Sequence, residues 1–263
     1  MYNALIQQFK AAQATATEAY AAVARAEVDL FPGLEDYERA VKSRSSYKTE
    51  RELKAFCTDL SELVVRIAQR EFAPAGGTIT IARDRELEEA GVDIGETLDK
   101  GGVPDLDRFS AHLKAKYAGE AGTTLGYQQA AKAIIDGLWL RPDSEMKRTA
   151  SGIVITAPVG SEASYSTAGR RRISHYTTDR VAALFRGIAT FATMAGYLEL
   201  AAVLRRSWVL RDEYYSRDKL LFEGLEITRF NDKWQFRFAH AVGDALSLFL
   251  SEHGAEHLAS RAR

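Results

Sequence analysis

Two runs of alternating apolar and polar residues near the carboxyl end restrict the fold of this 263-residue chain more than any other feature. Leu225 and Ile227 alternate with polar neighbours in the first run. The return run alternates in the same way around three aromatic residues, Trp234, Phe236 and Phe238. A period of two residues is typical of a half-buried β-strand. Asn231 and Asp232 lie between the runs and tolerate the positive φ angles of a two-residue turn, so the pattern predicts a β-hairpin.

A helix is predicted directly after this hairpin. Leu246, Phe249 and Leu250 follow at helical spacing, and Gly254 is typical of a helix end. Neither the hairpin nor the helix contains a catalytic constellation. We expect Glu226 and Lys233 to form an ordinary cross-strand ion pair.

Composition restricts the class of protein and its compartment. The chain is 46% hydrophobic, which is enough to bury a sizeable core. Its net charge of −1 argues against both a generally basic nucleic-acid coat and an acidic nucleic-acid mimic. Cys57 is the single cysteine, so no internal disulfide is expected. Because the sequence shows neither a long uncharged apolar run nor a secretory pattern, we expect a cytoplasmic protein that does not enter membranes.

The amino-terminal part of the chain is predicted to be helical. Residues 3 to about 72 are rich in alanine and nearly free of helix-breaking residues. Apolar side chains recur at three- and four-residue spacing, which predicts two long helices connected around residues 31–33 (Phe-Pro-Gly). The second helix is expected to end at residues 74–77 (Pro-Ala-Gly-Gly), before a short strand at 78–81 and a charged helix at 83–90.

The rest of the chain mixes helices and strands. The predicted segments are helices at 105–117 and 127–139, a hairpin with strands at 152–157 and 170–176, and a long helix from about 180 to 206. The last helix is expected to follow a cap at residues 177–179 and to bend near Gly196. These segments predict an α+β protein. Residues 1–74 would form a long helical hairpin, and residues 75–263 a mixed domain with a small antiparallel sheet packed on long helices.

The densest group of basic residues lies in the predicted hairpin. Guanidinium groups are well suited to contact phosphate oxygens, and a neighbouring tyrosine can stack on a base. The candidate nucleic-acid-binding residues are Arg148, Tyr165, Arg170, Arg171, Arg172 and His175. In the alternative, the arginines alternate between the two faces of a strand, where some pair with Glu145, Glu162 or Asp179 and the rest are solvated.

Other reactive residues fit structural roles better than catalytic ones. Cys57 lies in an apolar helical pattern, which favours burial as a small hydrophobic residue. His253 and His257 are four residues apart, a spacing used by helical metal sites, but Gly254 between them favours a frayed polar tail. His112 is expected to be a surface or satisfied core histidine rather than a general base. We predict no catalytic residue, no cofactor and no metal ligand.

From about residue 105 to residue 254 the order of features resembles the domain of unknown function catalogued as DUF 4942. The similar features are a helix ending in a Gly-Leu step at 137–138, a Gly-Ile-Val-Ile strand at 152–155, a helix after Asp179, and the terminal aromatic hairpin and helix. The resemblance implies proteins of phages, plasmids and integrative elements, with biology connected to DNA or host defence. It transfers no catalytic residues and leaves the amino-terminal helices unexplained.

Our interpretation is a non-enzymatic accessory or anti-defence protein of a mobile genetic element. It would bind DNA or a nucleoprotein complex through the basic hairpin. The alternative is a protein-interaction module, in which the alanine-rich helices form a homo-oligomer or hold a host protein. A third hypothesis is a divalent-metal-dependent nuclease built on Glu223, Glu226 and Lys233.

Overall fold

The chain forms an α+β structure, which confirms the predicted fold class. The computed structural model describes residues 1–42, 44–142, 144, 146–165, 167–206 and 212–261. Their contacts divide the chain into two compact units. The amino-terminal unit comprises Met1–Glu71 and Ile81–Ala118, and the carboxyl-terminal unit comprises Phe72–Thr80 and Gly119–Arg263.

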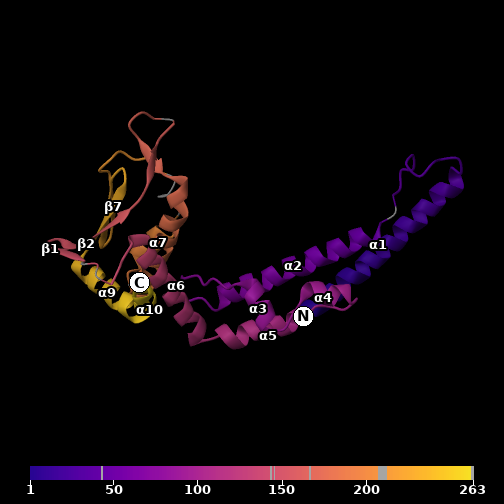
Figure 1. Cartoon of the computed structure of the whole chain (residues 1–263), viewed down its shortest axis with the longest axis horizontal. Coiled ribbons are helices and arrows are strands. Elements are labelled where there is room, and N and C mark those ends of the chain that lie inside the picture. The colour runs from indigo at the N-terminus through magenta and orange to yellow at the C-terminus, as the bar shows by residue number, and fades with distance from the viewer. Residues whose placement is uncertain (43, 143, 145, 166, 207–211, 262–263) are drawn as a thin grey trace. The chain divides into compact units, whose positions relative to one another are not determined.

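Two long helices dominate the amino-terminal unit, as the sequence predicts. The helices of this unit are α1 (Tyr2–Leu30), α2 (Ser46–Glu71), α3 (Arg83–Glu89), α4 (Ile94–Asp99) and α5 (Leu106–Tyr117). α1 and α2 lie side by side (Figure 1), and the rings of Phe9 and Phe56 stack with 4.2 Å between their centroids. Asp107 fixes the start of α1, because it accepts hydrogen bonds from the chain's terminal amine and from the N–H of Tyr2, each at 2.8 Å.

The apolar core of this unit includes the contact between α2 and α5. Cys57 is fully buried, as its apolar spacing predicts, and burial raises the pKa of its thiol to about 11. A thiol with that pKa is protonated at neutral pH and is a poor nucleophile. The other buried apolar residues of α2 and α5 are Leu60, Val64, Val65, Ala68, Leu106, Phe109 and Leu113.

Residues 81–118 pack with the amino-terminal helices, whereas the sequence places them in the second domain. α5 contacts both α1 and α2, and α3 contacts α2. The apolar faces of these short helices are therefore covered within the amino-terminal unit. The division into domains at residue 74 stays a prediction.

The prediction of a short strand at residues 78–81 is wrong, since these residues join no β-ladder. The side-chain amide of Gln129 takes the place of a neighbouring strand. It accepts a hydrogen bond from the N–H of Thr80 at 2.7 Å and donates one to the Thr80 carbonyl at 2.9 Å. One side chain thus satisfies both backbone groups, and no ladder partner is needed.

A five-stranded antiparallel sheet forms the centre of the carboxyl-terminal unit, in the order β1-β2-β7-β6-β5. Its strands are β1 (Lys147–Thr149), β2 (Gly152–Pro158), β5 (Lys219–Phe222), β6 (Leu225–Arg229) and β7 (Lys233–Phe238). The predicted β6–β7 hairpin is confirmed, and Phe230 donates its N–H to the Lys233 carbonyl at 2.9 Å across the turn. The aromatic residues that alternate along β7 are fully buried: Trp234, Phe236 and Phe238.

The register of this hairpin corrects the predicted ion pair between Glu226 and Lys233. A two-residue turn places Glu226 opposite Arg237, not opposite Lys233. The Glu226 carboxylate accepts from Arg237 at 3.4 Å and lies 3.0 Å from the ammonium of Lys219 on the neighbouring strand β5.

The hairpin predicted between residues 152–157 and 170–176 is also corrected. β2 lies between β1 and β7, and residues 152–155 are all buried, which is typical of a central strand. β4 (Arg171–Ile173) instead pairs with β3 (Ser161–Ala163) in a separate two-stranded sheet.

Helices cover the sheet and pack against one another. They are α6 (Glu120–Leu138), α7 (His175–Met194), α8 (Leu198–Leu204), α9 (His240–His253) and α10 (Ala255–Ser260). α6 and α7 approach closely where glycine leaves room, because a Cβ on Gly187 would lie 2.8 Å from the carbonyl oxygen of Ala130. Among the described helices, none is both long enough and apolar enough to cross a lipid bilayer.

The long helix after the arginines starts earlier than predicted. α7 begins at His175, because the hydroxyls of Thr177 and Thr178 bond the Ser174 carbonyl, both at 3.1 Å, inside the first turn rather than capping it. The predicted single helix to residue 206 is instead two helices, because α7 ends at Met194 and Gly196, with a φ of +84°, lies between α7 and α8.

Candidate nucleic-acid interface

The β3–β4 hairpin carries the arginine group that the sequence singles out. In its register Glu162 lies opposite Arg172. Side chains alternate along β4, so Ile173 is buried in the core of the carboxyl-terminal unit while Arg172 is exposed. Arg170, just before the strand, is also exposed.

Arg171 holds the hairpin together rather than extending from it. Its guanidinium donates to the hydroxyl of Ser161 at 2.6 Å and to the Ser161 carbonyl at 2.8 Å. Its own N–H and carbonyl pair with the backbone of Tyr214, at 2.8 and 2.9 Å. The hairpin is therefore tied to the segment that precedes β5.

The two exposed arginines each lie over a tyrosine ring. The guanidinium carbon of Arg172 is 4.6 Å from the ring centroid of Tyr165, and that of Arg170 is 5.2 Å from the centroid of Tyr215. Both distances are within the range of a cation–π contact. The rings are themselves accessible, with Tyr165 87% and Tyr215 46% exposed.

Negative charge at the hairpin comes in part from Glu162. Its carboxylate lies 3.4 Å from Arg172, and the hydrogen bonds from Ser174, Arg172 and the N–H of His175 hold the pKa of Glu162 below its ordinary value. The alternative prediction, that an arginine of this group pairs with a nearby carboxylate, is thus confirmed for Arg172. Arg170 forms no ion pair with any carboxylate in the described part of the chain. Of the two other predicted partners, Glu145 lies outside the described residues, and Asp179 forms no ion pair within the part of the chain that the structure describes.

The structure brings five of the six predicted residues together. His175 begins α7 next to the hairpin, and its ring centroid is 5.9 Å from that of Tyr176, which is 91% exposed. Arg148 lies on β1, at the end of β2 remote from the hairpin, and forms an ion pair with Asp244 of α9. Tyr215 was missed, because nothing in the local sequence signals its contact with Arg170.

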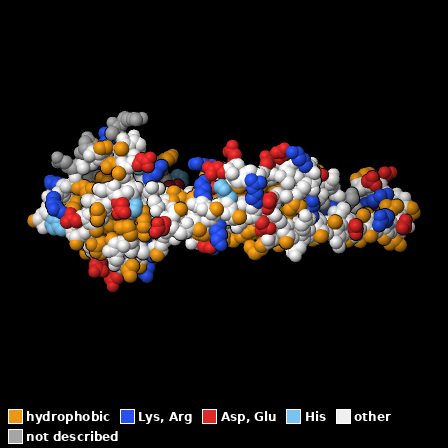
Figure 2. Space-filling model, turned by 90° about the horizontal axis from the view of Figure 1, so that it is seen from below, with side chains coloured by type: hydrophobic (Ala, Val, Ile, Leu, Met, Phe, Trp, Pro, Cys, Tyr) orange, Lys and Arg blue, Asp and Glu red, His pale blue; other side chains and the backbone are white. Residues whose placement is uncertain are grey.

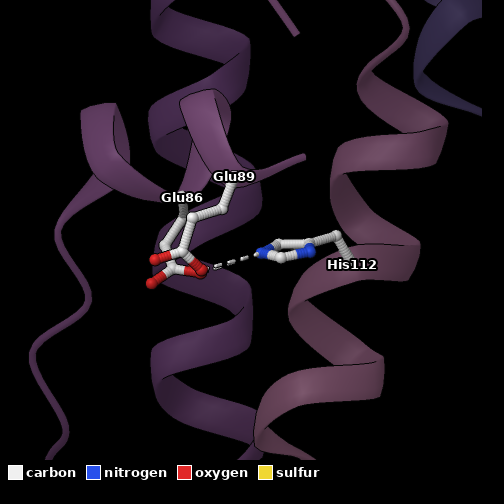
Figure 3. A group of neighbouring side chains, drawn as sticks. All are labelled: Glu86, Glu89 and His112. Carbon is white, nitrogen blue, oxygen red and sulfur yellow. Dashed lines mark hydrogen bonds and ion pairs between the residues drawn. The ribbon is translucent and has the colours of Figure 1, made fainter. Parts of the chain in front are cut away.

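A second group of polar side chains lies in the amino-terminal unit, between α3 and α5 (Figure 3). Glu86, Glu89 and His112 bring two carboxylate oxygens and a ring nitrogen within 4.8 Å of one another. Nε2 of His112 lies 2.9 Å from a carboxylate oxygen of Glu86. Carboxylates and imidazole are donors that transition metals accept.

Lys116 already supplies a cation to this group. Its ammonium lies 2.8 and 2.9 Å from the two oxygens of Glu86 and 2.5 Å from Glu89. The hydroxyl of Tyr117 donates to Glu86 at 2.6 Å. We therefore assign the group, named here the Glu86 cluster, the structural role of joining α3 to α5. His112 has a hydrogen-bond partner, Glu86, within the cluster, as expected for a satisfied core histidine.

The protonation of the Glu86 cluster follows from these contacts. Burial alone would raise the pKa of Glu86, but hydrogen bonds from Lys116, Tyr117 and His112 outweigh it and hold that pKa below its ordinary value. Burial, together with the hydrogen bond to Glu86, raises the pKa of Tyr117. The buried carboxylate is therefore ionised and the phenol neutral at neutral pH.

The two histidines near the carboxyl end lie in different environments. The ring of His253 packs against Tyr127 and Phe249, with 5.1 and 5.0 Å between centroids. α10 continues the chain beyond Gly254, and Nε2 of His257 lies 2.8 Å from Asp136 of α6. The predicted frayed tail is wrong, because this contact holds α10 against α6.

The fold and the hairpin together define an α+β protein with an exposed arginine and tyrosine surface. Comparisons with protein families, with characterised proteins and with solved structures find no match to this chain. The resemblance to DUF 4942 stays a prediction.

Proposed function

We propose that this protein binds nucleic acid or a nucleoprotein complex through the β3–β4 hairpin, without catalysis. The observation that supports the proposal is the pair of exposed guanidinium groups, Arg170 and Arg172, each lying over an accessible tyrosine ring. A guanidinium has five N–H donors, so one held beside an aromatic ring still has N–H groups for phosphate oxygens. Because the whole chain has a net charge of −1, its attraction for nucleic acid has to be local.

The biological setting of the proposal rests on the resemblance to DUF 4942. A protein that binds nucleic acid through one small surface suits an accessory or anti-defence role for a mobile genetic element. We place this role in the cytoplasm, where such an element is copied and where its host's defences act on it.

Reversing the charge of both exposed arginines should weaken binding to a labelled oligonucleotide. For the double variant Arg170→Glu and Arg172→Glu we expect a loss of about 10- to 100-fold at low salt. The dependence of log affinity on log salt should also flatten by about 1 for each phosphate contact removed. Fluorescence anisotropy titrations at several salt concentrations measure both quantities.

The control for this experiment is Arg148→Glu, which reverses an exposed arginine at the far end of β2. Its affinity should stay close to that of the unaltered protein. Arg171 is left unchanged, because its contacts with Ser161 hold the hairpin together. Equal binding by the double variant and the unaltered protein would remove the proposed function.

A second candidate function is self-association through α1. This helix buries only Ile6 among its 29 residues. Tyr20, Val23 and Leu30 recur at helical spacing on it and are 49%, 55% and 72% exposed. Figure 2 shows such apolar side chains, in orange, at the surface of the amino-terminal unit. An apolar stripe of this kind on a long helix favours pairing with a second copy.

Light scattering tests this second candidate on the full chain. The unaltered protein should have about twice the monomer mass of 29.1 kDa. Val23→Glu with Leu30→Glu should return it to the monomer mass, since charges on the stripe oppose its burial. Ala11→Glu with Ala22→Glu, which alters exposed residues away from the stripe, should leave the dimer intact. A monomeric unaltered protein would exclude the candidate.

A further inference from the structure

Three tyrosine rings extend from the hairpin and its surroundings into solvent. Tyr165 and Tyr176 are 87% and 91% exposed, and Tyr215 is 46% exposed. Each lies beside a basic side chain. The guanidinium carbon of Arg172 is 4.6 Å from the ring centroid of Tyr165, and that of Arg170 is 5.2 Å from the centroid of Tyr215. The ring centroids of His175 and Tyr176 are 5.9 Å apart. Basic and aromatic residues are thus interleaved over one small surface.

The rings have open faces on which a base can stack. Arg172 covers one side of Tyr165, and the high exposure of that ring leaves most of its surface accessible. Tyr176 is more exposed still. Stacking on an aromatic ring needs a base whose own face is free, which is the case in a single strand and not inside a duplex.

The shape of the hairpin disfavours reading of a duplex groove. A two-stranded ribbon that enters the major groove presents the side chains of one face to the bases. Here β3 and β4 have only three residues each. One face holds the structural Arg171 and the buried Ile173, so the short strands present only Glu162 and the opposite Arg172 on their other face, which is too few side chains to read a groove.

Base stacking is also expected to contribute more to the affinity than the phosphate contacts do. Two exposed arginines offer about two phosphate contacts, and these give a shallow salt dependence, with a slope of about −0.7 for each contact on a single strand. Each base stacked on a ring adds about 5- to 150-fold in affinity. Contacts to the bases therefore have to supply most of the binding.

We infer that the hairpin binds single-stranded nucleic acid. Unpaired bases stack on Tyr165 and Tyr176, and Arg170 and Arg172 contact the phosphates between them. This inference rests on the proposed function and narrows its ligand to one class.

Anisotropy titrations of the full-length protein test this choice of ligand. The probes are labelled oligothymidine and oligouridine of about 15 nucleotides and a duplex of the same length. Both single strands should bind at least about tenfold more tightly than the duplex. A difference between oligothymidine and oligouridine would show whether DNA or RNA is preferred.

Tyrosine variants test the stacking contacts directly. Tyr165→Ala with Tyr176→Ala should weaken single-strand binding by about tenfold or more, whereas the Phe substitutions at the same positions keep the rings and should retain most of the affinity. The matched control is Tyr37→Ala with Tyr47→Ala, because these tyrosines of the amino-terminal unit are 80% and 71% exposed. All four positions are exposed, so the variants should fold normally.

The results separate the inference from the proposed function. Equal affinity for duplex and single strands, or no effect of the alanine variants, would overturn the stacking inference. If Arg170→Glu with Arg172→Glu still weakened binding, the proposed function would remain. Absence of binding to every probe would overturn both.

Discussion

Replacing Glu86 with glutamine is expected to lower the free energy of unfolding of the amino-terminal unit by about 3 kcal/mol. The Glu86 side chain is 3% exposed and binds Lys116, Tyr117 and His112 at once. Glutamine keeps the shape but removes the negative charge, so the Lys116 ammonium loses its buried counterion. Urea unfolding followed by far-UV circular dichroism measures the loss, because this unit is formed almost entirely by helices.

The matched control is Glu89→Gln, in the same cluster but with a side chain that is 35% exposed. Water can replace its contact with Lys116, so we expect a loss of about 1 kcal/mol or less. Equal losses of unfolding free energy for the two substitutions would show that the burial of Glu86 does not determine how much the cluster stabilises the unit.

The dependence on pH gives a further check on Glu86. Its pKa is held below the ordinary value, so its contribution is present above the unfolded-state pKa of about 4.3 and is lost as the pH falls through the lower folded-state pKa. The unaltered protein should therefore lose more stability than the glutamine variant on acidification below about pH 4. Parallel losses in the two proteins would contradict the assignment.

The sequence predicts those parts of the fold that local periodicity determines. The alternation of Trp234, Phe236 and Phe238 gives β7 directly, and the Asn231-Asp232 turn sets its register with β6. The long helices α1 and α2 follow in the same way from apolar spacing in an alanine-rich segment. In each case the information lies within a few residues of chain.

Long-range pairing is what the sequence does not reveal. β2 pairs with β7, some eighty residues away, although the nearer β4 has a similar strand-like sequence. The extended residues 78–81 find their partner in the side chain of Gln129, a contact that no periodicity signals. The Glu86 cluster likewise joins two helices whose separate sequences are ordinary charged patterns.

The candidate site was predictable in composition but not in detail. A run of three arginines is visible in the sequence, and their alternation in a strand correctly suggests different environments for neighbours. Only the structure shows that Arg171 binds Ser161, whereas Arg170 lies over Tyr215. The difference depends on the backbone pairing of Arg171 with Tyr214, two segments that are distant in sequence.

That pairing makes Tyr214 the residue whose truncation should damage the hairpin most. Its side chain is fully buried, its ring packs edge-on against Trp234 with 6.0 Å between centroids, and the guanidinium of Arg229 lies 4.5 Å from its ring centroid. Tyr214→Ala leaves a cavity and removes the aromatic partner of a cation that is itself buried. We expect a loss of about 3–5 kcal/mol in the free energy of unfolding.

Tryptophan fluorescence in urea reports on this effect, since Trp139 and Trp234 belong to the carboxyl-terminal unit and no tryptophan occurs in residues 1–118. Tyr214→Phe is the control, because it keeps the ring and removes only hydroxyl contacts of 3.4 Å with Trp234 and the Phe230 carbonyl. It should cost about 1 kcal/mol and leave nucleic-acid binding unchanged.

Tyr214→Ala should also weaken binding at temperatures where the unit remains folded, because the hairpin loses a support on which the positions of Arg170 and Arg172 depend. Full binding by a folded Tyr214→Ala protein would show that the hairpin keeps its arrangement without this anchor.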